Sequence, residues 1–278
     1  MKKINRRSFL AAAGLTAAAL ALTACGGSAS STASSTASSA ASSEAASTSA
    51  AAELTTVEAG KLTMATNAAF PPYEMTTDAG EFEGIDIDTA KAIAEKLGLE
   101  LQIDDMDFDA ALLSVQQGKA DIVMAGVTVT DERKAVMDFS DSYATGIQSI
   151  IVPEGSDITS PDDLAGKKIG TQRGTTGYIY CSDDFGDDAV VAYDDGLTAV
   201  QALNNGQVDA VVIDNAPAQE FVAANPGLVI LDTSYAEEDY AIGLAKGSAL
   251  EDAVNAALEE LKADGTLQSI VDKYITAE

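Results

Sequence analysis

Side chains that could bind a small charged ligand stand directly after one of the apolar runs of the chain. The run at residues 122–125 ends in Gly126, and Thr128 and Arg133 follow within a few residues. An arginine guanidinium binds a carboxylate through two parallel hydrogen bonds. Gly126 would let the backbone approach a ligand closely, and the Thr128 hydroxyl could donate to the same carboxylate. This spacing predicts a carboxylate-binding site.

A simpler interpretation of Arg133 has to be kept open. Thr130 is suited to the N-cap of a helix, and Asp131 and Glu132 are suited to its first turn. Arg133 could then pair with these two acids at the surface and contact no ligand. The residues alone do not decide between a surface ion pair and a ligand clamp.

A second set of polar residues follows another expected strand. Residues 173–177 (RGTTG) stand between that strand and an expected helix, and they include Thr175 and Thr176. Backbone N–H groups at the start of a helix suit an anion, although the lysine and spacing of a phosphate loop are absent. Asp214 ends a later apolar run and would attract a cation, unless it only caps the turn before Pro217.

Together these groups predict a zwitterionic ligand. An arginine with hydroxyl and amide donors binds a carboxylate, and an aspartate binds an ammonium group. Phe70 and Phe108 could supply apolar walls, although either residue alone is more often part of a core. The groups therefore match the main chain of an amino acid.

The elements that would position these residues form an α/β pattern that begins near Gly60. Residues 61–66 read as a strand, and the apolar spacing of residues 87–97 predicts a helix that stops at Gly98. The stretch 116–126 (QQGKADIVMAG) resembles 204–214 (NNGQVDAVVID), and the stretch 60–70 resembles 166–176. Two similar lobes follow from this internal repeat. Because ligands bind beyond the carboxyl ends of parallel strands, we expect the lobes to face each other across a cleft.

The C-terminal part is expected to end in an amphipathic helix. Ser248 and Glu251 have the spacing of a capping box. A buried stripe is expected behind that cap, formed by Leu250, Val254, Ala257, Leu258 and Leu261.

Charge and composition exclude several classes of function. The 278 residues include 16 Lys and Arg against 44 Asp and Glu, which gives a net charge of −28. Such an acidic chain is a poor nucleic-acid binder, because phosphates would repel it. The chain has no histidine, which excludes Ser-His and Cys-His nucleophiles and histidine metal sites. We expect no metal and no cofactor.

The first 24 residues read as an export signal, with a basic start and a small apolar run. The run ends in Leu22-Thr23-Ala24-Cys25, which resembles the lipobox of bacterial lipoproteins. That resemblance implies a lipidated (palmitate-bearing) Cys25 and a protein anchored on the extracellular or periplasmic face of the cell membrane. Residues 6–10 suit a twin-arginine signal or an ordinary basic start equally well.

Residues 25–57 are rich in Ser and Ala and read as a disordered tether. Cys181 is expected to be a buried thiol without a disulfide.

Several motifs in order resemble the family 3 extracellular solute-binding proteins, the amino-acid receptors of ABC importers. The resemblance covers roughly residues 58–278 and rests on the segments 84–88 (GIDID), 107–109 (DFD), 128–133 (TVTDER), 139–141 (FSD) and 263–266 (ADGT). Thr89 departs from the family, which prefers a large apolar residue there, and Ala125 replaces a common serine. The implied fold is a type II periplasmic-binding-protein-like α/β fold. Its first lobe would comprise residues 58–147 and 237–278 and its second lobe residues 148–236, with strands crossing near 145–150 and 234–241.

The resemblance also assigns roles to residues. Arg133 would clamp the α-carboxylate with help from Thr128, and Asp214 would hold the α-ammonium group. Phe70 would lie over the ligand side chain with Phe108 opposite. Asn67 takes a position that is often Asp in receptors for basic amino acids, which favours a neutral polar ligand unless Glu74 or another acid lines the same pocket.

The function implied is a non-enzymatic, monomeric receptor that delivers an L-amino acid to an ABC permease. The alternatives are a sensor or adhesive surface lipoprotein, or a dehydratase-like enzyme on the same fold. The identity of the amino acid is left open.

Overall fold

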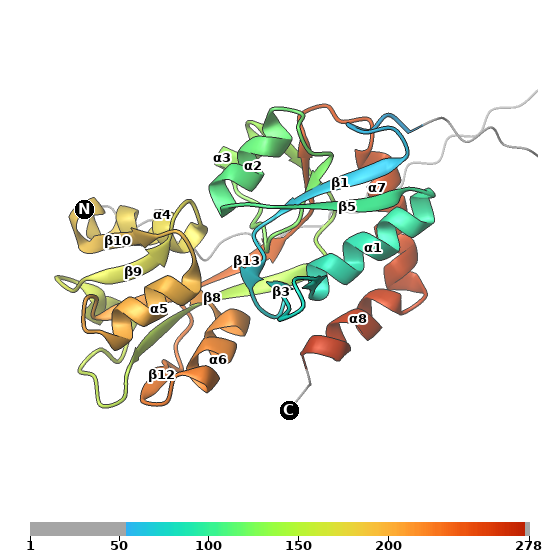
Figure 1. Cartoon of the computed structure of the whole chain (residues 1–278). Coiled ribbons are helices and arrows are strands. Elements are labelled where there is room, and N and C mark those ends of the chain that lie inside the picture. The colour runs from blue at the N-terminus through green and yellow to red at the C-terminus, as the bar shows by residue number, and fades with distance from the viewer. Residues whose placement is uncertain (1–53, 276–278) are drawn as a thin grey trace, which may run out of the picture. The chain divides into compact units, whose positions relative to one another are not determined.

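The computed structural model describes residues 54–275, and these residues form two α/β lobes (Figure 1). The expected signal at 1–24, Cys25 and nearly all of the expected tether lie outside the described residues. None of the helices within residues 54–275 has both the length and the apolar character needed to cross a membrane.

The first lobe is built on a five-stranded sheet in the order β5-β1-β6-β14-β7. The helices α1 and α2 pack on this sheet, and α7 and α8 pack against α1. A small sheet, β2-β3-β4, lies next to α1. The elements of the lobe are β1 (Lys61–Thr66), β2 (Ala69–Phe70), β3 (Glu74–Thr76), β4 (Phe82–Glu83), α1 (Ile85–Leu97), β5 (Glu100–Asp105), α2 (Phe108–Gln116), β6 (Ile122–Val123), α3 (Asp131–Lys134), β7 (Met137–Phe139), β14 (Gly243–Ala245), α7 (Glu251–Ala263) and α8 (Thr266–Tyr274).

The second lobe is built on the strand order β10-β9-β11-β8-β12, with β13 also paired to β8. The helices α4, α5 and α6 pack on this sheet. Its elements are β8 (Ala144–Pro153), the short 3-10 helices η1 (Pro161–Leu164) and η2 (Asp187–Ala189), β9 (Ile169–Gln172), α4 (Thr176–Phe185), β10 (Val190–Tyr193), α5 (Gly196–Asn204), β11 (Ala210–Asp214), α6 (Asn215–Ala224), β12 (Leu228–Ile230) and β13 (Ala236–Tyr240). Cys181 is fully buried in this lobe, as expected.

Two long strands connect the lobes. β8 and β13 pair antiparallel and run from one lobe to the other (Figure 1). Gly146 of β8 lies against the ring of Tyr240, and a β-carbon there would come within 2.4 Å of the ring carbon Cζ. A larger residue at this position would therefore push the two connecting strands apart.

The internal repeat of the sequence is visible in the backbone. Gly118 and Gly206 end the helices α2 and α5 in the same left-handed conformation, with φ of 66° and 65°. Three residues after each glycine, an aspartate accepts a hydrogen bond from the backbone of the neighbouring strand. Asp121 accepts from Thr63 N at 2.8 Å, and Asp209 accepts from Lys168 N at 2.7 Å. The two lobes thus use the same helix stop and the same strand-start contact.

The helix predictions were largely right, with two errors in the C-terminal part. α1 ends at Gly98 in the left-handed conformation, and the predicted apolar stripe of α7 is buried. The predicted capping box is wrong, because Leu250 takes the N-cap position and Ser248 Oγ accepts only from the Leu250 N–H. α7 is also not the last helix, since α8 follows it.

Candidate functional site

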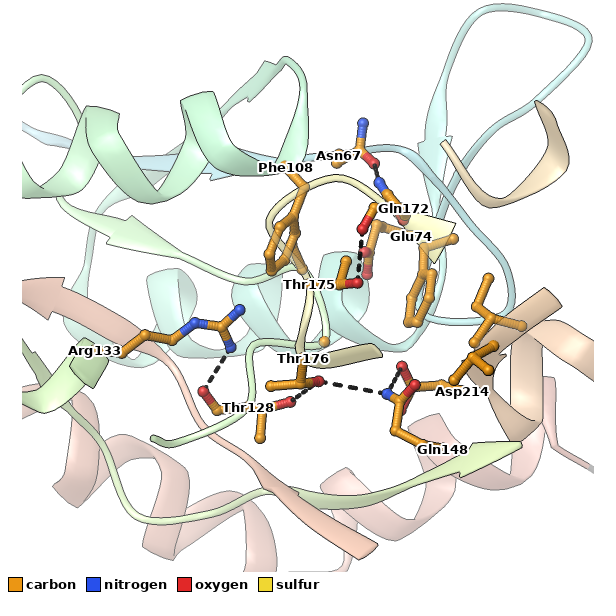
Figure 2. A pocket seen from close by; sticks show the side chains of 15 residues that line it. Asn67, Glu74, Phe108, Thr128, Arg133, Gln148, Gln172, Thr175, Thr176 and Asp214 are labelled. Atoms are coloured by element: carbon orange, nitrogen blue, oxygen red, sulfur yellow. Dashed lines mark hydrogen bonds between the residues drawn. The ribbon is translucent and has the colours of Figure 1, made fainter. Parts of the chain in front are cut away.

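A pocket between the two lobes collects the residues singled out in the sequence. All nine residues predicted to bind the ligand line this pocket: Asn67, Phe70, Phe108, Gly126, Thr128, Arg133, Thr175, Thr176 and Asp214. Six further residues complete the lining: Glu74, Ala125, Gln148, Gln172, Val212 and Ile213. Figure 2 shows Arg133 and Asp214 on opposite sides, with Thr128 and Thr176 between them.

Arg133 points into the pocket and not toward the surface. Thr130 caps α3 by accepting a hydrogen bond from the Arg133 N–H, as predicted, which fixes the backbone at the arginine. The guanidinium donates to the carbonyl of Thr128 at 2.7 Å and to the carbonyl of Gly174 at 3.2 Å. It lies over the ring of Phe108, 5.4 Å from the centroid, and the residue is only 8% exposed. The alternative of a surface pair with Asp131 and Glu132 is not what the structure shows.

Two of the five guanidinium N–H groups are used by these carbonyls, which leaves three for a ligand. Because the two carbonyls come from different lobes, Arg133 also joins the lobes on this side of the pocket. A carboxylate of a ligand would meet a positive charge that is already held in place.

The two threonine hydroxyls meet at a carboxylate that sequence reasoning missed. One oxygen of Glu238, from the connecting strand β13, accepts from Thr128 Oγ1 at 3.0 Å, Thr176 Oγ1 at 2.9 Å and Gln148 Nε2 at 3.0 Å. The signal that could have found Glu238 is strand alternation, since Glu238 and Tyr240 are the two buried members of the run 236–240.

Thr175 and Thr176 differ in what their side chains do. Thr175 caps α4, because its oxygen accepts from Tyr178 N and its hydroxyl donates to the Gln172 carbonyl at 2.8 Å. The hydroxyl of Thr175 is therefore occupied by the loop itself, whereas that of Thr176 faces the pocket network.

Asp214 is a buried acid at the end of β11. It makes no side-chain cap to α6, so the capping alternative is not what the structure shows. One oxygen accepts from Gln148 Nε2 at 2.8 Å, and the other accepts from the Tyr240 hydroxyl. Burial, reinforced by the nearby Glu238 carboxylate, raises the pKa of Asp214 to about 7. A ligand ammonium group would compensate this charge and lower the pKa.

The remaining wall surrounds the place for a ligand side chain. Gly126 has a φ of 55°, and a β-carbon there would lie 2.9 Å from the Phe70 ring, so the tight contact with Phe70 requires glycine. Asn67 donates to the Met106 carbonyl at 3.0 Å and accepts from Gln172 Nε2 of the other lobe at 2.8 Å. Its amide is thus largely engaged by the protein.

Glu74 changes the expected character of this wall. It lines the same pocket as Asn67 and is 0% exposed, and within residues 54–275 neither of its carboxyl oxygens has a hydrogen-bond donor. Burial, together with the nearby Asp86, raises its pKa well above the usual range. The condition attached to the neutral-ligand hypothesis, an acid in the same pocket, is therefore met, so Asn67 alone does not decide the charge of the ligand side chain.

Comparison with known proteins gives a consistent result. The family model of the bacterial extracellular solute-binding proteins, family 3, matches residues 62–277. A probable histidine-binding protein of Neisseria gonorrhoeae is 32% identical over 283 residues, which cover 99% of this chain and 98% of that protein.

Solved structures are similar over the described part of the chain. The arginine-, lysine-, histidine-binding protein ArtJ from Geobacillus stearothermophilus is 34% identical, with a TM-score of 0.75, and the match covers 78% of this chain and 96% of ArtJ. An ancestral arginine-binding protein bound to glutamine is 43% identical, with a TM-score of 0.75, over 78% of this chain and 99% of that one. An ancestral arginine-binding protein has also been solved bound to arginine. The predicted two-lobed periplasmic-binding-protein fold is confirmed by this similarity.

Proposed function

The chain belongs to the bacterial extracellular solute-binding proteins of family 3, and from this premise we propose that it is the receptor of an ABC importer for an L-amino acid with a cationic side chain. The main-chain half of the ligand would be held by the groups described above. Arg133 would bind the α-carboxylate and Asp214 the α-ammonium group, from opposite sides of the pocket.

The proposal of a cationic ligand side chain rests on the buried acid Glu74. A buried carboxylate without a donor or a counter-ion is destabilised by several kcal/mol. A guanidinium, ammonium or imidazolium group of a ligand would supply both the charge and the hydrogen bonds. Phe70, which pairs with Glu74 across β2 and β3 and whose ring lies against Gly126, would contact the aliphatic part of the side chain.

Several of the known relatives are named for this class of ligand, namely histidine, or arginine, lysine and histidine. Others are named for L-cystine or glutamine. Ancestral arginine-binding proteins were solved with arginine and with glutamine, so a neutral polar side chain is the natural competitor.

The wider setting of the receptor is part of the same proposal. Lipidation of Cys25 would anchor the protein on the outer face of the cell membrane, and the tether would let it present its ligand to the permease. We propose that it acts as a monomer, since one chain supplies the whole pocket, and that it binds its ligand without chemical change. Recovery of an unmodified amino acid after prolonged incubation would support that last point.

A binding screen with one matched pair of variants tests the cationic ligand. The twenty amino acids are screened by thermal shift, and the best binders are measured by calorimetry. We expect arginine, lysine or histidine to bind best. Glu74→Gln should reduce that preference over glutamine by at least about tenfold, which is roughly 1.4 kcal/mol. Glu81→Gln, an exposed acid close by in the chain, should leave it unchanged. A wild-type preference for neutral amino acids would refute the proposed ligand class.

A further inference from the structure

A second buried acid lies behind Glu74. Asp86, in the first turn of α1, is 0% exposed. Its Oδ2 atom accepts hydrogen bonds from the Gly126 N–H at 3.0 Å and from the Tyr143 hydroxyl at 2.8 Å. Its Oδ1 atom has no donor, and neither do the two oxygens of Glu74. Three buried carboxyl oxygens thus lack a partner as long as both acids are ionised.

A single proton on one of the two acids would relieve this lack of hydrogen-bond partners. Two carboxyl groups can hydrogen-bond to each other only when one of them is protonated. Burial raises the pKa of Glu74 well above its usual range and that of Asp86 to about 6. The hydrogen bond between the two carboxyls adds to the rise for Glu74 and opposes the rise for Asp86, which places the proton on Glu74 in the empty pocket. The two donors on Asp86 Oδ2 favour the negative charge on that residue.

Building on the proposed function, we propose that Glu74 and Asp86 share one proton and one negative charge, which rests on Asp86 in the empty pocket and passes to Glu74 when a cationic side chain binds. In this step the O–H bond of Glu74 breaks, and a new O–H bond forms at Asp86 Oδ1. The electron pair stays on the Glu74 carboxylate, and the proton never leaves the protein. Asp86 is therefore a positioning residue for specificity that does not touch the ligand.

The surroundings of the pair keep it from losing its proton. The titratable groups that face it are the carboxyls of Asp105 and Asp214 and the hydroxyls of Tyr73 and Tyr143. All of these groups are acids, and the two carboxylates raise the pKa of Glu74. A second negative charge on the pair is therefore opposed from several sides.

This arrangement predicts how the pocket treats two kinds of side chain. With the proton on Glu74, the pocket wall is neutral and tolerates an amide such as that of glutamine. With the proton on Asp86, Glu74 is a carboxylate and binds a guanidinium. The pair thus serves both ligands without exchanging a proton with the solvent.

The variant Asp86→Asn distinguishes the state with protonated Glu74 from the state with ionised Glu74. The Asn oxygen can still accept from Gly126 and Tyr143, which turns the amide N–H donors toward Glu74 and holds Glu74 as a carboxylate. We expect the ratio of arginine affinity to glutamine affinity to rise by about tenfold or more, mainly because glutamine binding weakens.

Tyr143→Phe removes one donor from Asp86 and should raise the same ratio by a smaller factor, which provides a second variant if the first folds poorly. Asp88→Asn, in the same helix and bonded to Lys273 and Tyr274, is the matched control and should not change the ratio.

The measurement is calorimetry with L-arginine and L-glutamine in two buffers of different ionisation enthalpy, which counts protons exchanged on binding. Asp214 faces the ammonium group of either ligand, so its contribution is the same for both. We expect equal proton counts for the two ligands in the wild type. Release of one additional proton with arginine would overturn the inference, as would equal losses of both affinities in Asp86→Asn. If the wild type binds no cationic amino acid, the proposed function itself is wrong. If the wild type prefers arginine but Asp86→Asn leaves the ratio of arginine affinity to glutamine affinity unchanged, only this inference is overturned.

Discussion

Replacement of Arg133 by Lys tests the carboxylate clamp, because it keeps the positive charge and removes the planar fork. In the structure, the guanidinium holds one carbonyl from each lobe and retains three N–H groups for a ligand. An ammonium group on a flexible stem can donate to one of these carbonyls or to the ligand, but it cannot present two parallel bonds to a carboxylate.

The expected loss follows from the bonds that disappear. A hydrogen bond to a charged group contributes about 1.5–3 kcal/mol. The loss of one such bond to the α-carboxylate should weaken binding by about 10- to 100-fold, at about 1.4 kcal/mol per factor of ten. The two contacts within the protein also come from the charged guanidinium, so the loss of one should lower the free energy of unfolding by about 1.5–3 kcal/mol, which is less than the roughly 5–15 kcal/mol stability of a typical domain. The fold should therefore survive while affinity falls.

Calorimetry with the preferred amino acid, together with a thermal melt of the ligand-free protein, measures both quantities. Arg173→Lys is the matched control, because this arginine is half exposed, lies in the same loop as Gly174 and does not line the pocket. It should bind like the wild type. An Arg133→Lys protein that binds within about twofold of the wild type would show that the guanidinium does not clamp the ligand.

Two further outcomes are expected. The ligand-free protein should lose stability as the pH rises from about 4 to about 7. Folded Asp214, with a pKa of about 7, keeps a proton in this range that the unfolded chain releases, and the effect is on the order of 4 kcal/mol. Thermal melts should show a weaker loss for Asp214→Asn, and an equally steep loss in that variant would contradict the assignment. Cys25→Ser should release the protein from membranes, measured by detergent partitioning, and unchanged partitioning would reject the lipid anchor.

Local signals in the sequence were sufficient for much of the fold. Gly118 and Gly206 each stop a helix, and the apolar strands that follow are continuous, so both lobes could be outlined from repeated short patterns. Arg133 was also accessible, because Thr130 fixes its backbone through a contact three residues away. Such features depend on neighbours in the chain and not on the tertiary structure.

The network at the centre of the pocket was not accessible in this way. Gln148 and Glu238 come from the two connecting strands, and Gln172 comes from the second lobe. The partners of their side chains lie 22 to 110 residues away in the chain. Glu238 also stands among other acids, so its charge alone did not distinguish it.

Asn67 was placed in the pocket correctly, but the sequence did not indicate what its amide contacts. It lines the pocket as predicted, but its amide bonds to Met106 and Gln172 and so contributes to joining the lobes. The residue that sets the charge of this wall is Glu74, whose burial depends on how the small sheet folds over the pocket. A single position three residues before Phe70 could not reveal that packing.

The charges of the whole site explain why the ligand itself must complete it. Four buried carboxyls, Glu74, Asp86, Asp214 and Glu238, surround or back the pocket, and Arg133 is the one guanidinium that lines it. Even with one proton shared by Glu74 and Asp86, the described site has more carboxyl groups than guanidinium groups. A neutral zwitterion leaves this balance unchanged, whereas a cationic amino acid adds a net positive charge next to Glu74. Because opposite charges attract more strongly where water is excluded, closure of the two lobes should favour the cationic ligand more than the neutral one.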